Sequence, residues 1–183
     1  MNTHKFFGIA LSAMVAMAAA MTLTACGGDD DHSPSSETYE PVAVEMNISF
    51  TVNDELLTYA NLTVEYFGSD GLLHKEPMTE RTWNKSVKAA LPATLGACLV
   101  PTEKEGVELP SKERMNFDNG YSYTYNLLDK NDGILNSGGY SEKGKSTPKI
   151  AQLPDWFNDF SKGLTMFLRR FDKNGNVHQL TWE

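Results

Sequence analysis

The sequence has few of the residues that most metal, nucleophilic and nucleic-acid sites require. Its 183 residues include two cysteines and four histidines, and 24 acidic residues outnumber 16 basic ones, for a formal net charge of −8. Affinity for nucleic acid comes largely from neutralising phosphates, so we expect no nucleic acid partner. For the same reason the chain is not expected to bind anionic lipids electrostatically.

The chain begins with a short basic segment, and an uncharged, mostly apolar run follows from Phe6 to Leu23. This order is typical of a secretory signal peptide. The run is nearly long enough to span a bilayer, so a retained transmembrane helix is the alternative. Its many alanines and its ending in small residues favour removal. We therefore expect residues 1–25 to be a cleaved signal peptide.

The signal ends in Leu23-Thr24-Ala25-Cys26, which resembles the bacterial lipobox. The resemblance implies a diacylglyceryl group on the Cys26 thiol, cleavage just before it and acylation of the new amino group. Several acyl chains anchor a protein stably, whereas one does not. An ordinary signal with Cys26 left as a free thiol is the alternative, and an exposed thiol is a liability in an oxidising compartment.

The residues after Cys26 are polar and suggest a location. Gly27 rather than Asp follows the cysteine, which by analogy with the enterobacterial sorting rule favours the outer membrane. The acidic cluster Asp29-Asp30-Asp31 resembles the export signal of Bacteroidota surface lipoproteins and implies exposure at the cell surface; the periplasmic face is the alternative. Residues 26–40 are predicted to form a flexible tether.

Residues 41–183 are long enough for a single domain with its own core. Loss of residues 1–25 removes Lys5 and no acid, so 15 basic and 24 acidic residues leave a net charge of about −9. Acylated Cys26 would leave Cys98 without a disulfide partner. Cys98 lies in an apolar run over 95–100, which favours a buried small hydrophobe over a nucleophile.

Alternation of apolar and polar residues is the main structural signal, and it is clearest over 42–52. Such alternation predicts strands with one buried face. The more continuously apolar run 94–100 predicts a strand buried on both faces. Residues 101–119 are predicted to be a long loop, and the Gly-, Ser- and Lys-rich residues 137–149 a mobile segment. Further strand-like runs lie at 62–67, 82–90, 121–127, 134–135, 164–171 and 177–182.

A short helix is predicted near 155–162, because Pro154 suits a first helical turn and Gly163 can end it. The rest of the domain gives about seven to nine short strands separated by turn signals. We therefore predict an all-β fold, an antiparallel β-sandwich that is immunoglobulin-like or transthyretin-like. A small barrel is the alternative, and the immunoglobulin cysteine pair is absent.

A second resemblance covers roughly residues 42–135. The motifs that carry it look like those of small Bacteroidota surface lipoproteins with one β-sandwich domain, a family that implies the fold but no established activity. These motifs are Leu62-Thr63-Val64-Glu65-Tyr66, Gly68-Ser69-Asp70-Gly71, Trp83-Asn84-Lys85, Leu91-Pro92-Ala93-Thr94 and Tyr121-Ser122-Tyr123-Thr124-Tyr125.

The sequence gives little support for a metal site or a cofactor site. His32, His74 and His178 are scattered and show no metal-ligand spacing. The turns that begin at Asp129 and Asp172 resemble calcium loops, but neither has a well-placed later carboxylate, so we read them as turns. We therefore expect no metal, no cofactor and no catalytic residue, although a carboxylate pair for glycoside hydrolysis remains open.

Aromatic residues are the remaining candidates for a binding site. Trp83, Trp182 and the alternating tyrosines of 121–125 are expected in the core or half-buried. Trp156 and Phe160 are four residues apart and share a helix face. Together with Phe157 they form either a cap on an open end of the sandwich or a surface ligand site.

The sequence thus predicts a non-enzymatic, lipid-anchored envelope protein that is displayed on the cell surface as a binding or adhesion module. A glycan-binding accessory protein of a nutrient-uptake system is the alternative, and a small hydrolase is a third hypothesis. The expected partners are the membrane, through the lipid on Cys26, and a glycan or an envelope protein.

Overall fold

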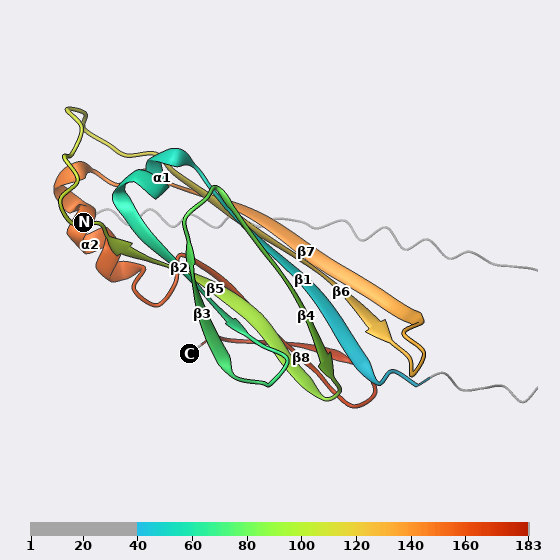
Figure 1. Ribbon diagram of the computed structural model, residues 1–183. Helices are drawn as coiled ribbons and strands as arrows, with labels where there is room; N and C mark the ends of the chain where they lie inside the picture. The colour runs from blue at the N-terminus through green and yellow to red at the C-terminus, as the bar shows by residue number, and fades with distance from the viewer. Residues whose placement is uncertain (1–39, 183) are drawn as a thin grey trace, which may run out of the picture. The chain divides into compact units, whose positions relative to one another are not determined.

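The structure is a computed structural model that describes residues 40–182. The predicted signal peptide, Cys26 and residues 26–39 of the tether lie outside the described residues. Two antiparallel sheets face each other (Figure 1). In order across the sheet, the first contains β4 (Thr82–Ala90), β1 (Ala43–Val52), β6 (Phe117–Leu128) and β7 (Ile134–Ser146); the second contains β3 (Leu73–Met78), β2 (Ala60–Phe67), β5 (Ala93–Glu103), β8 (Thr165–Phe171) and β9 (Val177–Leu180).

This architecture confirms the predicted all-β antiparallel sandwich, with nine strands among the described residues. The clearest alternating run forms β1, which lies between β4 and β6 and pairs with both. Val44, Met46, Ile48 and Phe50 are buried between the sheets. The residues between them point away from the second sheet, because successive side chains of a strand alternate between its faces.

Strand β5 is buried on both faces, as its continuous apolar run predicts. Leu95 to Leu99 are all buried, and Leu95 and Leu99 belong to the core between the sheets. Cys98 faces the opposite way and lies under the segment that follows α2, where its Sγ donates to the Lys162 carbonyl at 3.3 Å. Both faces of β5 are therefore covered by protein.

Two short α-helices and a 3₁₀ turn join strands. The predicted helix is present as α2 (Leu153–Asp159), with Pro154 in its first turn, and it follows η1 (Ile150–Gln152). Helix α1 (Asp54–Tyr59) was not predicted; Asn53 caps it by accepting from the Leu56 N–H at 3.0 Å. No helix within residues 40–182 combines the length and apolar character needed to cross a membrane.

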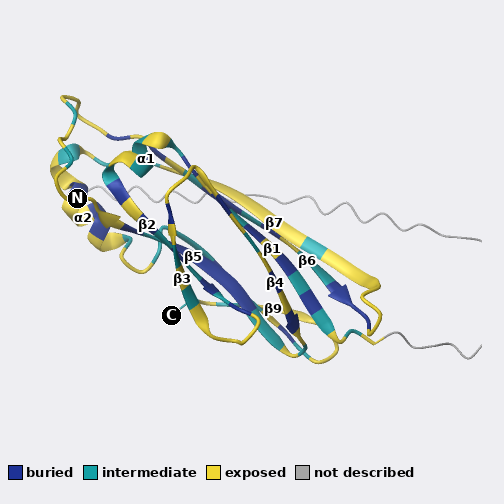
Figure 2. Cartoon of the chain, in the orientation of Figure 1, coloured by how far each residue is buried: buried dark blue, intermediate teal, exposed yellow. Residues whose placement is uncertain are grey.

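The prediction of a mobile segment at 137–149 is wrong, because β7 continues to Ser146. This strand is paired with β6 along almost its whole length, although nearly all its side chains are exposed (Figure 2). Backbone pairing with a long neighbour holds it in the sheet, so its sequence needs no apolar alternation. Strands β5 and β6 also extend into the predicted 101–119 loop and reduce it to residues 104–116.

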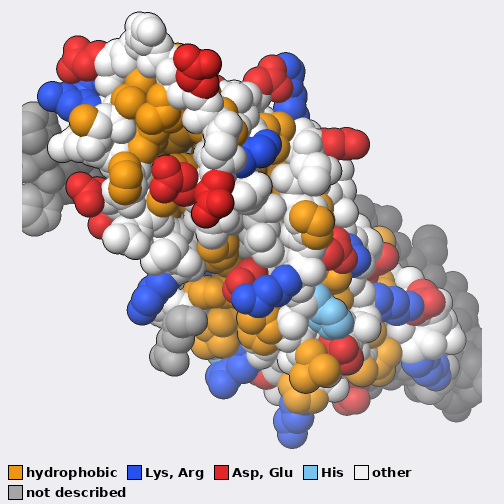
Figure 3. All heavy atoms as spheres, turned by 60° about the vertical axis from the view of Figure 1, so that its left-hand side comes forward, with side chains coloured by type: hydrophobic (Ala, Val, Ile, Leu, Met, Phe, Trp, Pro, Cys, Tyr) orange, Lys and Arg blue, Asp and Glu red, His pale blue; other side chains and the backbone are white. Residues whose placement is uncertain are grey.

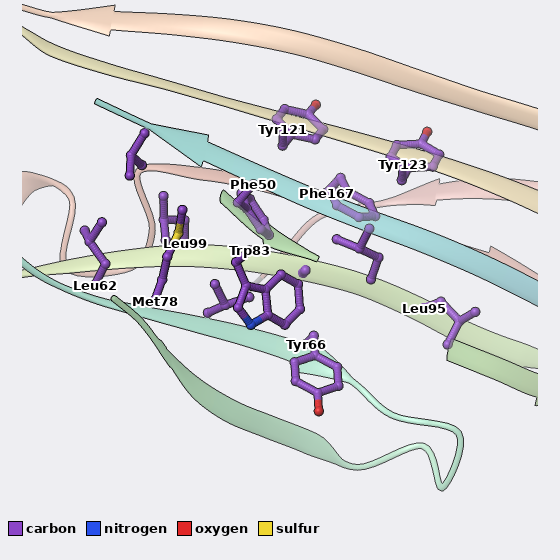
Figure 4. Packing of buried hydrophobic residues seen from close by; sticks show 14 of the residues in the cluster. Phe50, Leu62, Tyr66, Met78, Trp83, Leu95, Leu99, Tyr121, Tyr123 and Phe167 are labelled. Atoms are coloured by element: carbon purple, nitrogen blue, oxygen red, sulfur yellow. The ribbon is translucent and has the colours of Figure 1, made fainter. Parts of the chain in front are cut away.

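Aromatic rings fill the middle of the core (Figure 4). Phe50 of β1 lies 6.1 Å from Trp83 of β4 and 6.4 Å from Tyr121 of β6, measured between ring centres. Phe167 of β8 stacks on Tyr121 at 5.4 Å and joins the two sheets. Each fully buried large apolar side chain contributes about 1.5–3 kcal/mol, so these contacts hold the two layers together.

Candidate functional site

The predicted aromatic candidates on α2 are largely buried. Only 7% of Trp156 and 8% of Phe157 is exposed, and Phe160 is partly buried. The Trp156 ring packs 4.8 Å from Phe117, and its indole N–H donates to the Ser146 hydroxyl at 2.7 Å. This geometry agrees with the cap alternative. It leaves little of the Trp156 and Phe157 rings free to act as a surface platform.

The other aromatic candidates also serve packing. Trp83, Tyr121 and Tyr123 are buried in the core. Trp182 is partly buried and lies 5.5 Å from Phe67. None of these rings forms the flat exposed platform that sugars often stack on.

The edges of β3 and β4 are joined by a polar network around Glu76 that forms the closed side of the sandwich. The Glu76 carboxylate accepts from the Lys85 ammonium at 2.6 Å, the Tyr66 hydroxyl at 2.7 Å and the Trp83 indole N–H at 3.1 Å. The Lys85 ammonium also lies 4.9 Å from the centre of the Tyr66 ring. The bond from Lys85, followed by that from Tyr66, lowers the pKa of Glu76. The network binds the two sheets to each other.

Cys98, His74 and His178 lie in different places and do not form a joint site. Burial raises the pKa of the Cys98 thiol to about 12, so the reactive thiolate is scarce at neutral pH. His74 contacts Asp70 at 3.0 Å in the turn before β3, and His178 of β9 lies 3.8 Å from Asp172. These contacts are local to two turns in different parts of the second sheet.

The calcium-like turns use their carboxylates internally. Asp129 Oδ1 accepts from the N–H groups of Asn131 and Gly133 at 2.7 and 2.8 Å. Asp172 makes the same pattern with Asn174 and Asn176. The Asn176 side-chain amide also donates to Asp172, and this bond, followed by the backbone bonds, lowers the pKa of Asp172. Such side-chain bonds stabilise turns. Within residues 40–182, no group of three His, Cys, Asp or Glu side chains is placed to hold a metal ion.

The outer face of the first sheet is a regular array of small polar side chains, which we call the polar face. Strand register places sixteen residues on it in four rows, and eleven of them are Ser, Thr or Asn. The rows, each read from β4 to β7, are Lys88, Glu45, Asn126, Ser137; Ser86, Asn47, Thr124, Gly139; Asn84, Ser49, Ser122, Ser141; and Thr82, Thr51, Gly120, Lys143. The two middle rows carry no charge.

Three open hollows of about 420, 340 and 440 Å³ lie along this face. Ser49 and Ser122 line both the first and the second hollow. Charged side chains line parts of them as well: Lys85 in the first, Glu142 in the second, and Asp118 and Lys145 in the third. The view in Figure 3 shows acidic and basic side chains interspersed with hydrophobic groups.

Hydroxyl and amide side chains both donate and accept hydrogen bonds. The two middle rows of the polar face combine them without charge, which suits a neutral ligand that also carries both donors and acceptors. Short side chains such as serine lose little rotamer freedom when they are immobilised. The sequence shows these residues only as the polar half of alternating strands, and register is needed to bring the four strands together.

Comparisons of the chain with protein-family models, with curated proteins and with solved structures give no match. The fold defines the protein as an antiparallel β-sandwich.

Proposed function

We propose that this chain is a non-enzymatic, lipid-anchored binding module of a bacterial cell surface, and that it binds neutral glycans on the polar face. The observation that carries the proposal is the array of Ser, Thr and Asn side chains on the polar face, whose two middle rows carry no charge. A glycan presents many hydroxyls that each donate and accept, which complements such an array. The lipobox-like end of the signal supports the anchor.

Binding is tested by affinity gel electrophoresis and glycan arrays with neutral polysaccharides. Ser122→Gln places a larger uncharged side chain in two hollows at once, and we expect it to weaken binding about tenfold, which corresponds to about 1.4 kcal/mol. Ser111→Gln, in the exposed 104–116 loop, is the matched control and should bind like the wild type. Equal binding by both variants would remove the polar face as the site, and no binding by the wild type would refute the glycan proposal.

The anchor is tested separately by metabolic labelling with a fatty-acid probe. The wild type should carry the label and sediment with membranes. Cys26→Ala should lose both properties, because the thiol that receives the diacylglyceryl group is gone. A labelled Cys26→Ala protein would contradict lipidation at this residue without affecting the glycan proposal.

A further inference from the structure

The sandwich has an open side opposite the closed side at Glu76. There the inward faces of both edge strands, β7 and β9, are exposed to solvent. Tyr140 of β7 pairs with the buried Tyr123 and therefore points toward the second sheet, yet it is 50% exposed. On β9, Val177 pairs with the buried Phe171 and is 36% exposed. The two sheets therefore do not cover each other along this side.

Tyrosines line the wall of the open side. The rings of Tyr121 and Tyr123 stack on Phe167, and their hydroxyls point away from it (Figure 4). The Tyr140 ring centre lies 5.9 Å from that of Tyr121 and 6.5 Å from that of Tyr123. Glu142, the next inward residue of β7, accepts from the Tyr121 hydroxyl at 3.2 Å. The exposed Tyr140 ring therefore lies beside a layer that is formed by Tyr121, Tyr123 and Glu142.

Arg169 of β8 enters this layer with part of its hydrogen-bonding capacity unused. Its Nε donates to the Tyr123 hydroxyl at 2.8 Å, and its Nη1 donates to the Leu168 carbonyl at 2.9 Å. An arginine has five N–H donors, so three remain without a partner among residues 40–182. No Asp or Glu in this range lies within 4.0 Å of the guanidinium.

This arginine is also held in place. Its guanidinium carbon lies 5.2 Å from the centre of the Tyr123 ring, and the two hydrogen bonds use Nε and Nη1, so both N–H groups of Nη2 have no partner among residues 40–182. A half-buried, oriented guanidinium with free N–H groups is suited to bind a carboxylate through two parallel hydrogen bonds. A half-buried arginine with no carboxylate partner in the described domain is available to a carboxylate from outside it.

We propose that Arg169 and Tyr140 form a second binding site, on the inward side of β7 and β8, for a carboxylate-bearing sugar such as a hexuronate unit of an acidic glycan. The guanidinium binds the sugar carboxylate, and the exposed Tyr140 ring packs against the C–H face of the sugar. Glu142 and the Tyr121 hydroxyl meet the sugar hydroxyls. The inward positions of β7 next to Tyr140 are Gly138 on one side and Glu142 on the other, so on the Gly138 side no side chain of that strand shields the ring.

The experiment compares a galacturonate oligosaccharide with a neutral galactose oligosaccharide of the same length by isothermal titration calorimetry, using the full-length protein in detergent. We expect the wild type to bind the galacturonate probe, with an affinity that falls as salt is raised. Arg169→Gln should weaken this binding at least about tenfold. Arg170→Gln is the matched control, since it removes the same charge from the neighbouring exposed residue on the opposite face of β8, and it should leave the affinity within about twofold.

Tyr140→Ala provides an independent test if Arg169→Gln fails to fold, because Tyr140 is half exposed. It should weaken galacturonate binding severalfold, while circular dichroism remains that of the wild type. Unchanged affinity in Tyr140→Ala, or an equal loss in the Arg169 and Arg170 variants, would overturn the site. So would equal competition by an oligoglutamate peptide, which would show a general anion or peptide site instead.

The second site shares Tyr121 and Glu142 with one hollow of the polar face, but its carboxylate contact at Arg169 lies outside that hollow, so the two proposals fail separately. Ser122→Gln should lose neutral glycans and keep galacturonate binding, whereas Arg169→Gln should do the reverse. If the wild type binds the neutral probe but not galacturonate, the second site alone is refuted.

Discussion

Glu76 is the most informative single residue for the closed side of the sandwich, because one carboxylate receives donors from both sheets. Tyr66 belongs to β2, and Trp83 and Lys85 belong to β4. Glu76→Gln preserves the size and shape of the side chain and removes its charge. It also replaces one of the two acceptor oxygens by an NH₂ group, which cannot accept from the Trp83 indole N–H or from Lys85.

The expected loss of stability is modest and can be worked out from the contacts. Glu76 and Lys85 are 36% and 35% exposed, so their ion pair is treated as a surface pair worth about 0.5 kcal/mol. One of the other two hydrogen bonds is lost as well, which costs about 1 kcal/mol. We therefore expect Glu76→Gln to lower the free energy of unfolding by about 1.5 kcal/mol at neutral pH.

The difference between the two proteins should depend on pH. The pKa of Glu76 is lowered from 4.5 in the folded state, so its charge stabilises the fold above pH 4.5. That contribution is lost as the pH falls below 4.5 through the folded pKa. Since a protonated glutamic acid is uncharged like glutamine, the stabilities of wild type and variant should converge in acid.

Urea denaturation followed by circular dichroism at a series of pH values measures this difference. Glu80→Gln is the matched control, because Glu80 is exposed and makes no hydrogen bond or ion pair within the described domain. It should behave like the wild type at every pH. Equal stability of Glu76→Gln and wild type at neutral pH, or a difference that does not shrink in acid, would refute the reasoning.

Three further outcomes are expected. Trp156→Ala should lower the free energy of unfolding by about 3–5 kcal/mol, measured by chemical denaturation, because it removes a buried ring; a loss below about 1 kcal/mol would contradict the cap. Cys98 should react slowly with a maleimide in the native protein and fast in urea, since burial raises its pKa; fast native labelling would show an exposed thiol. Asp129→Ala should speed amide hydrogen exchange at Asn131 and Gly133, which its carboxylate accepts from; unchanged exchange would refute that role.

The parts of the fold that follow from local pattern were predictable from the sequence. Period-two alternation is sufficient for β1, whose residues alternate between the core and the outer face. Continuous apolar character is sufficient for β5, which is covered on both sides. Pro154 correctly predicts the first turn of the second helix, which begins at Leu153 and ends at Asp159, before the predicted end at Gly163.

The parts that depend on pairing with distant segments were not predictable. Strand β7 has exposed side chains on both faces and is held by the backbone of β6, so its own residues give no strand signal. The short helix α1 begins after the Asn53 cap, where the chain passes from the first sheet to the second. In the sequence this segment appears only as an interruption between two strands. Register is a long-range property, and a shift of one residue reverses every side chain.

The candidate sites also differ in whether they follow from the local sequence or from the pairing of distant segments. The helical spacing of Trp156 and Phe160 was visible in the sequence, and their rings lie 5.0 Å apart, but spacing alone did not decide between a cap and a surface site. The polar face combines residues from four strands, and Arg169 becomes noteworthy only when its surroundings lack a carboxylate. Such features arise from the tertiary arrangement of ordinary polar residues.

The central position of β1 has a mechanical consequence. The chain enters the domain through this strand, and the proposed lipid at Cys26 would pull on its first residues. Strand β1 is paired with β4 from Ala43 to Thr51 and with β6 from Ala43 to Val52. A pull along the strand loads both ladders in shear, so their hydrogen bonds resist together instead of opening one at a time. A cell-surface protein tethered in this way would transmit tension from a bound ligand to the membrane before its domain unravels.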